Sequence, residues 1–381
     1  MNDAPAALAD FGSTWAQRRL RPDVLHFDSA SAGRPSEATL DAVGGYARRE
    51  AVIGASVAYV EAADVITRLR TDLAEQFGVT AEGIALTESA TNAFRTLLRV
   101  WPLPAGARVA VVPAEWGPNL EDLAAAGHTL VPLAADGEGA VDLAALEQLL
   151  RTARPDVVLL TQVASHRTLV QPVAAAVALC RAADVPVWVD SAQAIGHIDT
   201  ATGADAMFAP ARKWLAGPRG VGVLAVAARH LDSLRVPSAA LLPDASPMQL
   251  VSSHEAHMAG RIGLANALRE YLADGPTAVR TRLAQVGEQT RAALADVAGW
   301  TVVGAGNASA LGAITALRAT GDVRIADARA ELLQAHGILT IVCVPARAPG
   351  DMTEPLLRVS PHVDCSAADL DRLATALRAV V

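Results

Sequence analysis

The sequence predicts an α/β protein with a seven-stranded, mostly parallel sheet flanked by helices, followed by a smaller α+β C-terminal domain. Short apolar runs rich in β-branched residues alternate with longer amphipathic segments, the pattern of a parallel sheet covered by helices. With 381 residues, 52% of them hydrophobic, the chain is longer than one compact domain usually is and can bury a large core. We therefore predict a large domain over residues 21–250. The small domain joins residues 1–20 to 251–381 and includes the connecting helix.

Apolar runs bounded by turn residues are the predicted strands of the large domain. They lie at 83–87, 108–112, 129–133, 156–161, 185–190, 204–208 and 221–226. Helices are expected in most of the gaps between them. In the segment 64–78, for example, apolar side chains recur at helical spacing from Ile66 to Phe77, and Gly78 suits a helix end.

The order of elements changes after about residue 245. A long helical stretch is expected from about 260 to 297, where it connects the two domains. Beyond it, apolar runs alternate with two further predicted helices, which is why we expect an α+β domain. The runs lie at 310–317, 338–344 and 355–360, and the helices near 324–335 and 366–379.

Composition excludes several classes of partner. A net charge of -8 without a basic stripe argues against nucleic-acid binding. The three cysteines are too few and too scattered for a disulfide framework or a CxxC metal site, and they fit a reducing compartment. No apolar run is long enough to span a membrane, and the N-terminal segment does not resemble a signal peptide. We therefore expect a soluble cytoplasmic protein.

Asp190 and Lys213 are the candidate centre of a functional site. Asp190 is the last residue of a predicted strand, and ligands of open parallel sheets bind beyond the carboxyl ends of strands. A metal site is not expected there, because His197 is only a loose candidate for a second ligand. Lys213 lies one strand further on, so both side chains are expected at the same edge. An amine and a carboxylate around one cleft suit pyridoxal phosphate, whose aldehyde bonds to lysine and whose ring nitrogen needs an acid. A surface lysine and a helix-capping aspartate are the alternative.

Two further segments could contact the same cofactor. The segment 86–94 opens a helix with small and hydroxyl residues, whose backbone N–H groups can hold a phosphate. The alternative is an ordinary helix cap by Ser89 or Thr91. Trp116 follows the second strand and could stack on a pyridine ring. Its alternative is a core or interface tryptophan.

An ordered set of motifs over about residues 20–380 resembles the class V, cysteine-desulfurase-like branch of fold type I pyridoxal phosphate enzymes. The motifs are HFDSA (26–30), ESATNA (88–93), AEW (114–116), VDSAQAIGH (189–197), ARKWLAGPRGVG (211–222) and LLRVSPH (356–362). The resemblance implies pyridoxal 5'-phosphate as cofactor and assigns roles by position. Lys213 would hold the cofactor covalently, Asp190 would contact its pyridine nitrogen, and Gln193 would contact its ring oxygen. Trp116 would stack on the ring, and Ala90 and Thr91 would bind the phosphate. Arg358 would bind the substrate carboxylate.

The chain departs from this family in two places. Pro210 and Ala211 stand where the family usually has a Ser or Thr that contacts the phosphate, so Arg212 is expected to supply charge instead. The cysteine of desulfurases lies in a loop, whereas Cys343 falls inside an apolar strand and is expected to be a core residue. Persulfide chemistry is therefore disfavoured.

Other segments resemble carbon–sulfur lyases of this branch. They include EWGPNL (115–120), VASHRTLVQP (163–172) and HEAHMAGRIGL (254–264). The expected reaction is β-cleavage of a cysteine S-conjugate or its sulfoxide to a thiol or sulfenate, pyruvate and ammonia. Ser165 and His166, next to Arg167 on the rim after the fourth strand, are candidate substrate contacts. A helix-capping serine and an exposed His–Arg pair are the alternative.

Other functions remain open at this point. A lincosamide-type enzyme that couples decarboxylation to oxidative deamination, or a class V aminotransferase or epimerase, would keep the same cofactor residues. A non-catalytic regulator that binds the cofactor is a further alternative. The resemblance also implies a homodimer, in which His257 and Arg261 are candidates to reach the partner's cofactor.

Overall fold

The computed structural model describes residues 4–236, 245–253, 255–304, 312–321 and 323–380. Its main element is a seven-stranded sheet with strand order β2-β8-β7-β6-β5-β3-β4. The predicted fold class is confirmed, and every predicted strand of this sheet is present, with ends that agree within two residues. In sheet order the strands are Ile84–Thr87, Gly222–Val226, Ala206–Pro210, Val187–Asp190, Val157–Thr161, Arg108–Val111 and Thr129–Pro132. Only β8 runs antiparallel to its neighbours.

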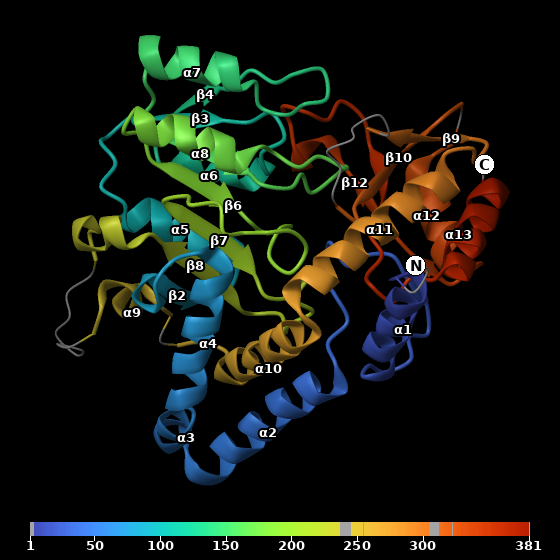
Figure 1. The fold of residues 1–381 in the computed structure, drawn as a ribbon, viewed down its shortest axis with the longest axis horizontal. Coiled ribbons are helices and arrows are strands. Elements are labelled where there is room, and N and C mark those ends of the chain that lie inside the picture. The colour runs from blue at the N-terminus through green and yellow to red at the C-terminus, as the bar shows by residue number, and fades with distance from the viewer. Residues whose placement is uncertain (1–3, 237–244, 254, 305–311, 322, 381) are drawn as a thin grey trace.

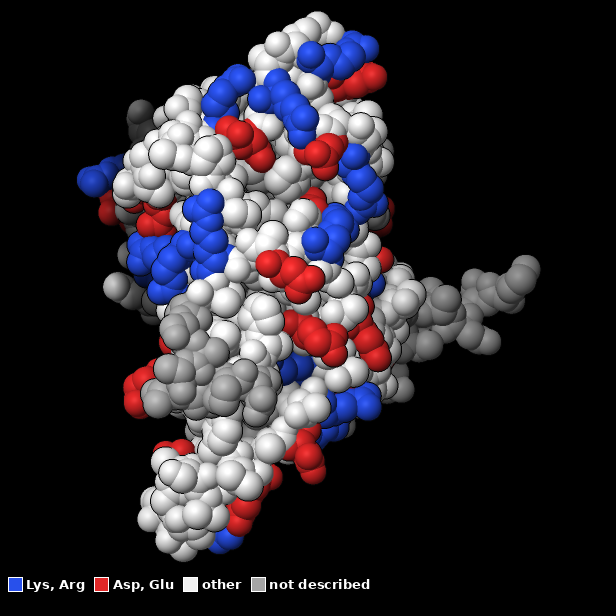
Figure 2. All heavy atoms as spheres, turned by 90° about the vertical axis from the view of Figure 1, so that its left-hand side faces the viewer, with Lys and Arg blue, Asp and Glu red and all other residues white. Residues whose placement is uncertain are grey.

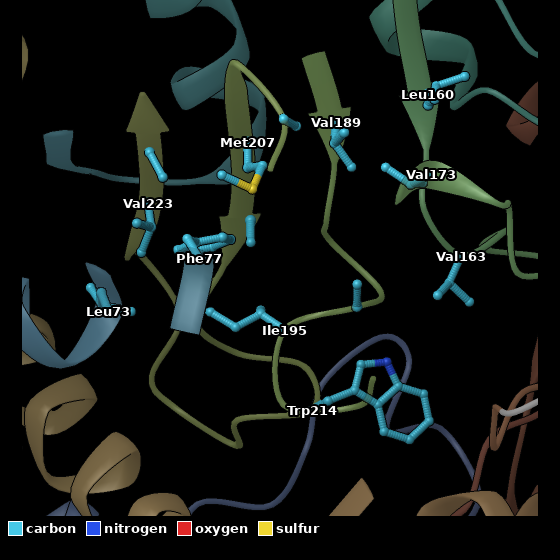
Figure 3. Packing of buried hydrophobic residues seen from close by; sticks show 14 of the residues in the cluster. Leu73, Phe77, Leu160, Val163, Val173, Val189, Ile195, Met207, Trp214 and Val223 are labelled. Carbon is cyan, nitrogen blue, oxygen red and sulfur yellow. The ribbon is translucent and has the colours of Figure 1, made fainter. Parts of the chain in front are cut away.

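Helices cover both faces of this sheet, and side chains of the strands alternate between the two resulting cores. In β5, Val158 and Leu160 face one core while Val157 and Leu159 face the other. Figure 3 shows the first core, where Met207 and Val223 gather around Phe77. This core contains side chains of α4 (Ala63–Phe77), α7 (Leu143–Thr152), α8 (Val173–Ala182) and α10 (Met258–Asp274). The other contains side chains of α5 (Ala90–Val100), α6 (Gly117–Ala125) and α9 (Pro247–Val251).

The connecting helical stretch is broken into two helices. α10 ends at Gly275, which has a φ of 83°, and α11 (Pro276–Leu294) begins with the next residue. Proline has no N–H to continue a helix and disfavours helical backbone in the residue before it, so the break is local in origin. α10 packs against α2 (Glu37–Ile53) and α4, whereas α11 packs against the C-terminal sheet. The predicted domain boundary at residue 250 stays a prediction.

The C-terminal part contains a four-stranded antiparallel sheet of order β12-β13-β10-β9. Its strands are Ile341–Cys343, Leu356–Val359, Thr315–Ala319 and Trp300–Val303, and α12 (Ile325–Gln334) and α13 (Ala367–Ala379) share its core. Of the predicted run 310–317, residues 310 and 311 lie outside the described residues. A short parallel pair joins β1 (Leu25–His26) to β11 (Ile338–Leu339). α1 (Ala4–Gln17) lies beside this part of the molecule (Figure 1).

The remaining elements lie at the periphery. α3 (Ala55–Glu61) follows α2 and forms a lobe at the bottom of Figure 1. Short 3₁₀ helices cover Ala81–Gly83 (η1), Ala228–Ser233 (η2) and Pro345–Arg347 (η3). On the face shown in Figure 2, charges of both signs are interspersed, and few lie on the α3 lobe. In the described part of the chain, no helix has the length and apolarity needed to cross a bilayer.

Candidate active site

A cavity of about 210 Å³ lies at the carboxyl edge of the seven-stranded sheet. Residues at or just beyond the ends of β5, β6 and β7 contribute to it, because Thr161 pairs in register with Asp190 and Asp190 with Phe208. Lys213 follows the end of β7 and lines the same cavity. Strands β3 and β5 are neighbours although β4 lies between them in the chain, so the order in which strands are added to the sheet reverses here. Such a switch point is where open α/β sheets bind ligands.

Asp190 is a buried carboxylate that faces this cavity. Its Oδ1 accepts a hydrogen bond from the backbone N–H of Ala192 at 2.7 Å, and its Oδ2 accepts one from Asn119 Nδ2 at 3.1 Å. Burial raises the pKa of Asp190, and the charge of Lys213 opposes this rise. Asp190 forms no ion pair within the described residues. A protonated ring nitrogen in the cavity would therefore supply the positive charge that this carboxylate lacks.

Glu115 is a second buried carboxyl group, directly behind Asp190. Its Oε1 accepts a hydrogen bond from Asn119 Nδ2 at 2.8 Å, and its Oε2 is hydrogen-bonded to Thr161 Oγ1 at 2.5 Å. Burial raises the pKa of Glu115 to about 8, and the neighbouring Asp190 adds to the rise. Glu115 is therefore the neutral member of this pair at neutral pH. The sequence analysis did not single out Glu115 or Asn119, although both lie within or next to the AEW motif.

Lys213 is placed to react as a neutral amine. Burial lowers its pKa to about 7, Asp190 opposes this shift, and the charges of Arg212, Arg358 and Arg347 add to it. An amine with a pKa near 7 is substantially unprotonated at neutral pH, which a nucleophile or a proton acceptor requires. The backbone on either side of Lys213 is held by Gly33, whose N–H donates to the Arg212 carbonyl at 2.7 Å. A Cβ at position 33 would lie 2.3 Å from the Lys213 carbonyl oxygen, so only glycine allows this approach.

Gln193 lines the cavity with an oriented side-chain amide. Its Nε2 donates to the Ala30 carbonyl at 2.9 Å, and its Oε1 accepts from Trp214 Nε1 at 2.9 Å. Trp214 in turn stacks on His197, with ring centroids 3.9 Å apart. Both nitrogens of His197 have partners, the Gln193 carbonyl at 2.8 Å and the Ala313 N–H at 2.7 Å. His197 is therefore a structural link between the site and the C-terminal part rather than a free ligand.

The first turn of α5 lines part of the cavity. Ala90 and Thr91 line it, and first-turn N–H groups of a helix have no acceptor within the helix. Ser89 caps the helix by accepting from the Asn92 N–H at 3.0 Å. β8 passes close beneath, since a Cβ on Gly222 would lie 2.3 Å from the Ser89 carbonyl carbon. Arg212 lines the same cavity, as its expected role requires.

Trp116 also lines the cavity, together with an arginine that the sequence analysis did not consider. Trp116 is half-buried just before α6. The Cζ atom of Arg347 lies 4.9 Å from the centroid of its ring, which is within cation–π distance. Nothing in the local sequence around Arg347 marks it as a site residue, because it comes from η3 in the C-terminal part.

Arg358 and Ser165 are joined at the wall of the cavity. Ser165 lines the cavity, and its carbonyl accepts from Arg358 Nη1 at 2.7 Å. Arg358 Nη2 donates to Asp28 Oδ1 at 2.9 Å and to Ser31 Oγ at 2.6 Å. The guanidinium is fully buried and does not itself line the cavity; its Nε has no partner. Contact with a substrate carboxylate therefore stays a prediction that requires a change of these contacts.

His166 is bound by a carboxylate from the C-terminal part of the chain. Its imidazole is fully buried, Nε2 lies 2.5 Å from Asp351 Oδ2, and Arg167 binds the same carboxylate through Nε at 2.7 Å. These groups line a neighbouring hollow of about 450 Å³, not the cavity of Lys213. Burial lowers the pKa of His166, although Asp351 opposes this. His166 does not line the cavity of Lys213, and its contact with a substrate stays a prediction.

His257 and Arg261 lie outside the cavity and contact their own chain. Arg261 Nη2 donates to the carbonyls of Leu86 at 2.9 Å and Ser253 at 2.7 Å, and the side chain is buried. His257 precedes α10 and packs close to Gly260. A contribution of either residue to a partner subunit stays a prediction.

The cysteines do not contribute to the site. Cys343 is fully buried in β12, so the prediction that it is a core residue is confirmed. Cys180 and Cys365 are also buried, and no cysteine of the chain lines the cavity. Across the described ranges, no group of His, Cys, Asp and Glu side chains could hold a metal ion.

Comparisons with known proteins agree with this geometry. The family model "Aminotransferase class-V" matches residues 25–373. A "probable hercynylcysteine sulfoxide lyase" of Mycobacterium tuberculosis (strain CDC 1551 / Oshkosh) is 43% identical over 366 residues, which cover 94% of this chain and 91% of that protein.

Solved structures with the same fold include two cysteine desulfurases. CsdA from Escherichia coli superposes with a TM-score of 0.84 at 20% identity, covering 97% of this chain and 98% of that one. The apo enzyme from Thermococcus onnurineus NA1 also has a TM-score of 0.84, at 18% identity, with 94% and 95% covered. The cystine C–S lyase C-DES, in complex with cysteine persulfide, has a TM-score of 0.82 at 18% identity, with 93% and 97% covered.

Proposed function

Because this chain belongs to the aminotransferase class-V family, in which it is a pyridoxal phosphate-dependent carbon–sulfur lyase, we propose that it cleaves the sulfoxide of a cysteine S-conjugate. Hercynylcysteine sulfoxide is the proposed substrate, and a sulfenate, pyruvate and ammonia are the proposed products. One observation supports this reaction most directly. Lys213 and Asp190 line the same cavity, and no cysteine lines it. A persulfide-forming desulfurase needs a thiol at the substrate, whereas a β-lyase needs only the amine.

The residues that line the cavity fit pyridoxal phosphate. Lys213 has an amine of lowered pKa, Asp190 has a buried carboxylate without an ion pair among the described residues, and the first turn of α5 and Arg212 line the cavity where donors to a phosphate are needed. Gln193 and Trp116 would contact the ring. When bound, the cofactor supplies an aldehyde that captures the amino acid and a ring that withdraws electrons from its α-carbon.

The chain's own residues then carry the proton steps. Lys213 would take the α-proton, for which its lowered pKa near 7 suits it. The Cβ–S bond breaks with its electron pair on sulfur, so the sulfur group leaves as a sulfenate and the remainder as 2-aminoacrylate. Water then converts 2-aminoacrylate to pyruvate and ammonia, and the balance needs no oxidant or reductant. Arg358 would orient the substrate by its α-carboxylate.

The test is to incubate the purified holoenzyme with hercynylcysteine sulfoxide and with simpler S-substituted cysteines and their sulfoxides. We expect pyruvate and ammonia in equal amounts without carbon dioxide. Carbon dioxide with an aldehyde would instead identify decarboxylation coupled to oxidative deamination, and a racemised or transaminated amino acid would identify an epimerase or aminotransferase. Any of these outcomes would overturn the proposed reaction.

We also propose that the enzyme acts as a homodimer in the cytoplasm. Exposed apolar side chains lie near the end of α2 and on α3: Val52, Val57, Tyr59 and Val60 are 51% to 79% exposed. Surfaces of this kind mark interfaces. Light scattering should give twice the chain mass, and Val60→Asp should reduce it; a monomeric wild type would contradict the dimer. The unpaired cysteines fit a reducing compartment, which cell fractionation would test.

A further inference from the structure

Arg347 lines the cavity with a guanidinium that has no assigned role in the reaction proposed above. Its guanidinium forms no hydrogen bond or ion pair with any described residue and lies over the Trp116 ring. Its Nε is shielded from solvent and has no partner. A cation in such a place gains free energy when an anion or a strong acceptor enters the cavity.

The position of Arg347 is built into the fold. η3 packs against the start of α6, where a Cβ on Gly117 would lie 2.1 Å from the Ala346 carbonyl oxygen. The Arg347 N–H donates to the Val344 carbonyl at 2.9 Å, and a Cβ on Gly350 would lie 2.8 Å from the Pro113 carbonyl oxygen. The loop of Arg347 is thus held against the loop of Trp116 at both ends. An accidental surface arginine would not need such close backbone packing.

The other cations around the cavity have partners or expected partners. Arg358 is hydrogen-bonded to Asp28 and lies behind the wall of the cavity. Its expected further partner is the α-carboxylate of the substrate. Arg212 and the first turn of α5 are expected to hold the phosphate. Arg347 is half-buried and lines the cavity, whereas Arg358 is fully buried and does not.

We propose that Arg347 binds the oxygen atom on the sulfur of the substrate and thereby makes the enzyme prefer a sulfoxide to the corresponding sulfide. This inference rests on the proposed function. A sulfoxide oxygen carries partial negative charge, and it becomes the sulfenate oxygen when the Cβ–S bond breaks and the electron pair moves to sulfur. The contact between a guanidinium and that oxygen becomes stronger as negative charge develops on the oxygen. Preorganised cations favour bond cleavage in this way.

The test compares S-benzyl-L-cysteine with its sulfoxide as substrates of the holoenzyme. In Arg347→Met we expect kcat/KM for the sulfoxide to fall about tenfold or more relative to the sulfide, on the scale of one charge-assisted hydrogen bond. Arg347→Lys should retain part of the preference. Arg219→Met is the matched control, since Arg219 is exposed and does not line the cavity. It removes the same charge and should leave the ratio unchanged.

A binding measurement separates this inference from the proposed function. In holoenzyme whose Lys213–cofactor bond has been reduced with borohydride, chemistry is blocked, and calorimetry gives the affinity for each compound. A sulfoxide preference that is lost in Arg347→Met supports the inference even if the wild type turns over neither compound, which would overturn only the proposed function. Equal loss for both compounds would show that Arg347 holds the α-carboxylate instead. An unchanged ratio would also overturn the inference.

Discussion

Asn119 Nδ2 lies 3.1 Å from Asp190 Oδ2, and the same nitrogen donates to Glu115 at 2.8 Å. One amide therefore holds two buried carboxyl groups in place. Two anions so close in a dry site are unfavourable, and Glu115 is the one that keeps its proton. Asp190 is left free to carry the charge that a ring nitrogen requires.

Glu115→Gln should preserve this arrangement, since a neutral amide replaces a neutral acid. Folding raises the pKa of Glu115 to about 8, so the folded protein binds this proton more tightly than the unfolded chain. The stability that results is present at low pH and is lost as pH rises from the unfolded pKa toward about 8. The melting temperature of apo Glu115→Gln should therefore fall less between pH 5 and pH 8 than that of the wild type. A parallel pH dependence of the two proteins would contradict the assignment.

Lys213→Ala should abolish covalent retention of the cofactor and lower kcat/KM by about 10²–10⁴-fold, because the variant lacks the proton acceptor. Dialysis followed by absorption spectroscopy measures retention. Arg219→Lys serves as the control, because Arg219 is exposed and does not line the cavity. A variant that keeps the wild-type spectrum after dialysis would show that another group holds the cofactor.

Trp214→Phe should destabilise the protein by about 1–3 kcal/mol, because Gln193 Oε1 loses its donor at 2.9 Å and the stack on His197 shrinks. It should also change the absorption of the bound cofactor, since Gln193 would then be held only by its hydrogen bond to the Ala30 carbonyl. Trp188→Phe is the matched control: Trp188 is fully buried, but its Nε1 has no partner. Urea unfolding and absorption spectra of both variants test this, and equal spectral effects would count against a role of Trp214 in orienting Gln193.

Gly222→Ala should weaken cofactor binding, because the new Cβ would lie 2.3 Å from the Ser89 carbonyl carbon and displace the first turn of α5. We expect the dissociation constant of the apo protein for pyridoxal phosphate to rise at least about tenfold, the cost of losing roughly one good phosphate contact. Gly45→Ala provides the comparison, since a Cβ there has nothing within 4 Å. In its helix, alanine should stabilise by about 0.5–1 kcal/mol. Undiminished affinity in Gly222→Ala would show that α5 does not hold the phosphate.

Arg261→Ala should also weaken cofactor retention. Arg261 donates to the Leu86 carbonyl in β2, directly before the loop that leads to α5. Removal costs this hydrogen bond from a charged group, about 1.5–3 kcal/mol, although the Leu86 carbonyl still accepts from the Ser253 N–H at 3.1 Å. A cofactor titration at several protein concentrations measures the effect. A loss that grows on dilution would favour a role across a subunit boundary, a loss independent of concentration would favour the contact within the chain, and no loss would contradict both.

Several features of the site could not be predicted from local sequence. Glu115, Asn119 and Thr161 meet because β3 and β5 are adjacent in the sheet, although β4 lies between them in the chain. Arg347 reaches the cavity from the C-terminal part, far along the chain from Trp116. His166 is bound by Asp351, which is also distant in sequence. Each of these contacts depends on long-range packing, for which spacing along the chain has no signal.

The sequence by itself determined the strands of the large sheet, the position of Asp190 at a strand end and the position of Lys213 just beyond the next strand. These follow from local physics, because strands buried on both faces are short continuous apolar runs and polar residues must lie where the runs stop. Only the tertiary structure decided which carboxyl group stays neutral, which arginine lines the cavity without a hydrogen-bond partner among the described residues, and which histidine contacts a distant carboxylate. Those properties depend on burial and on partners from distant segments, since the same side chain changes its pKa and its role with the groups packed against it.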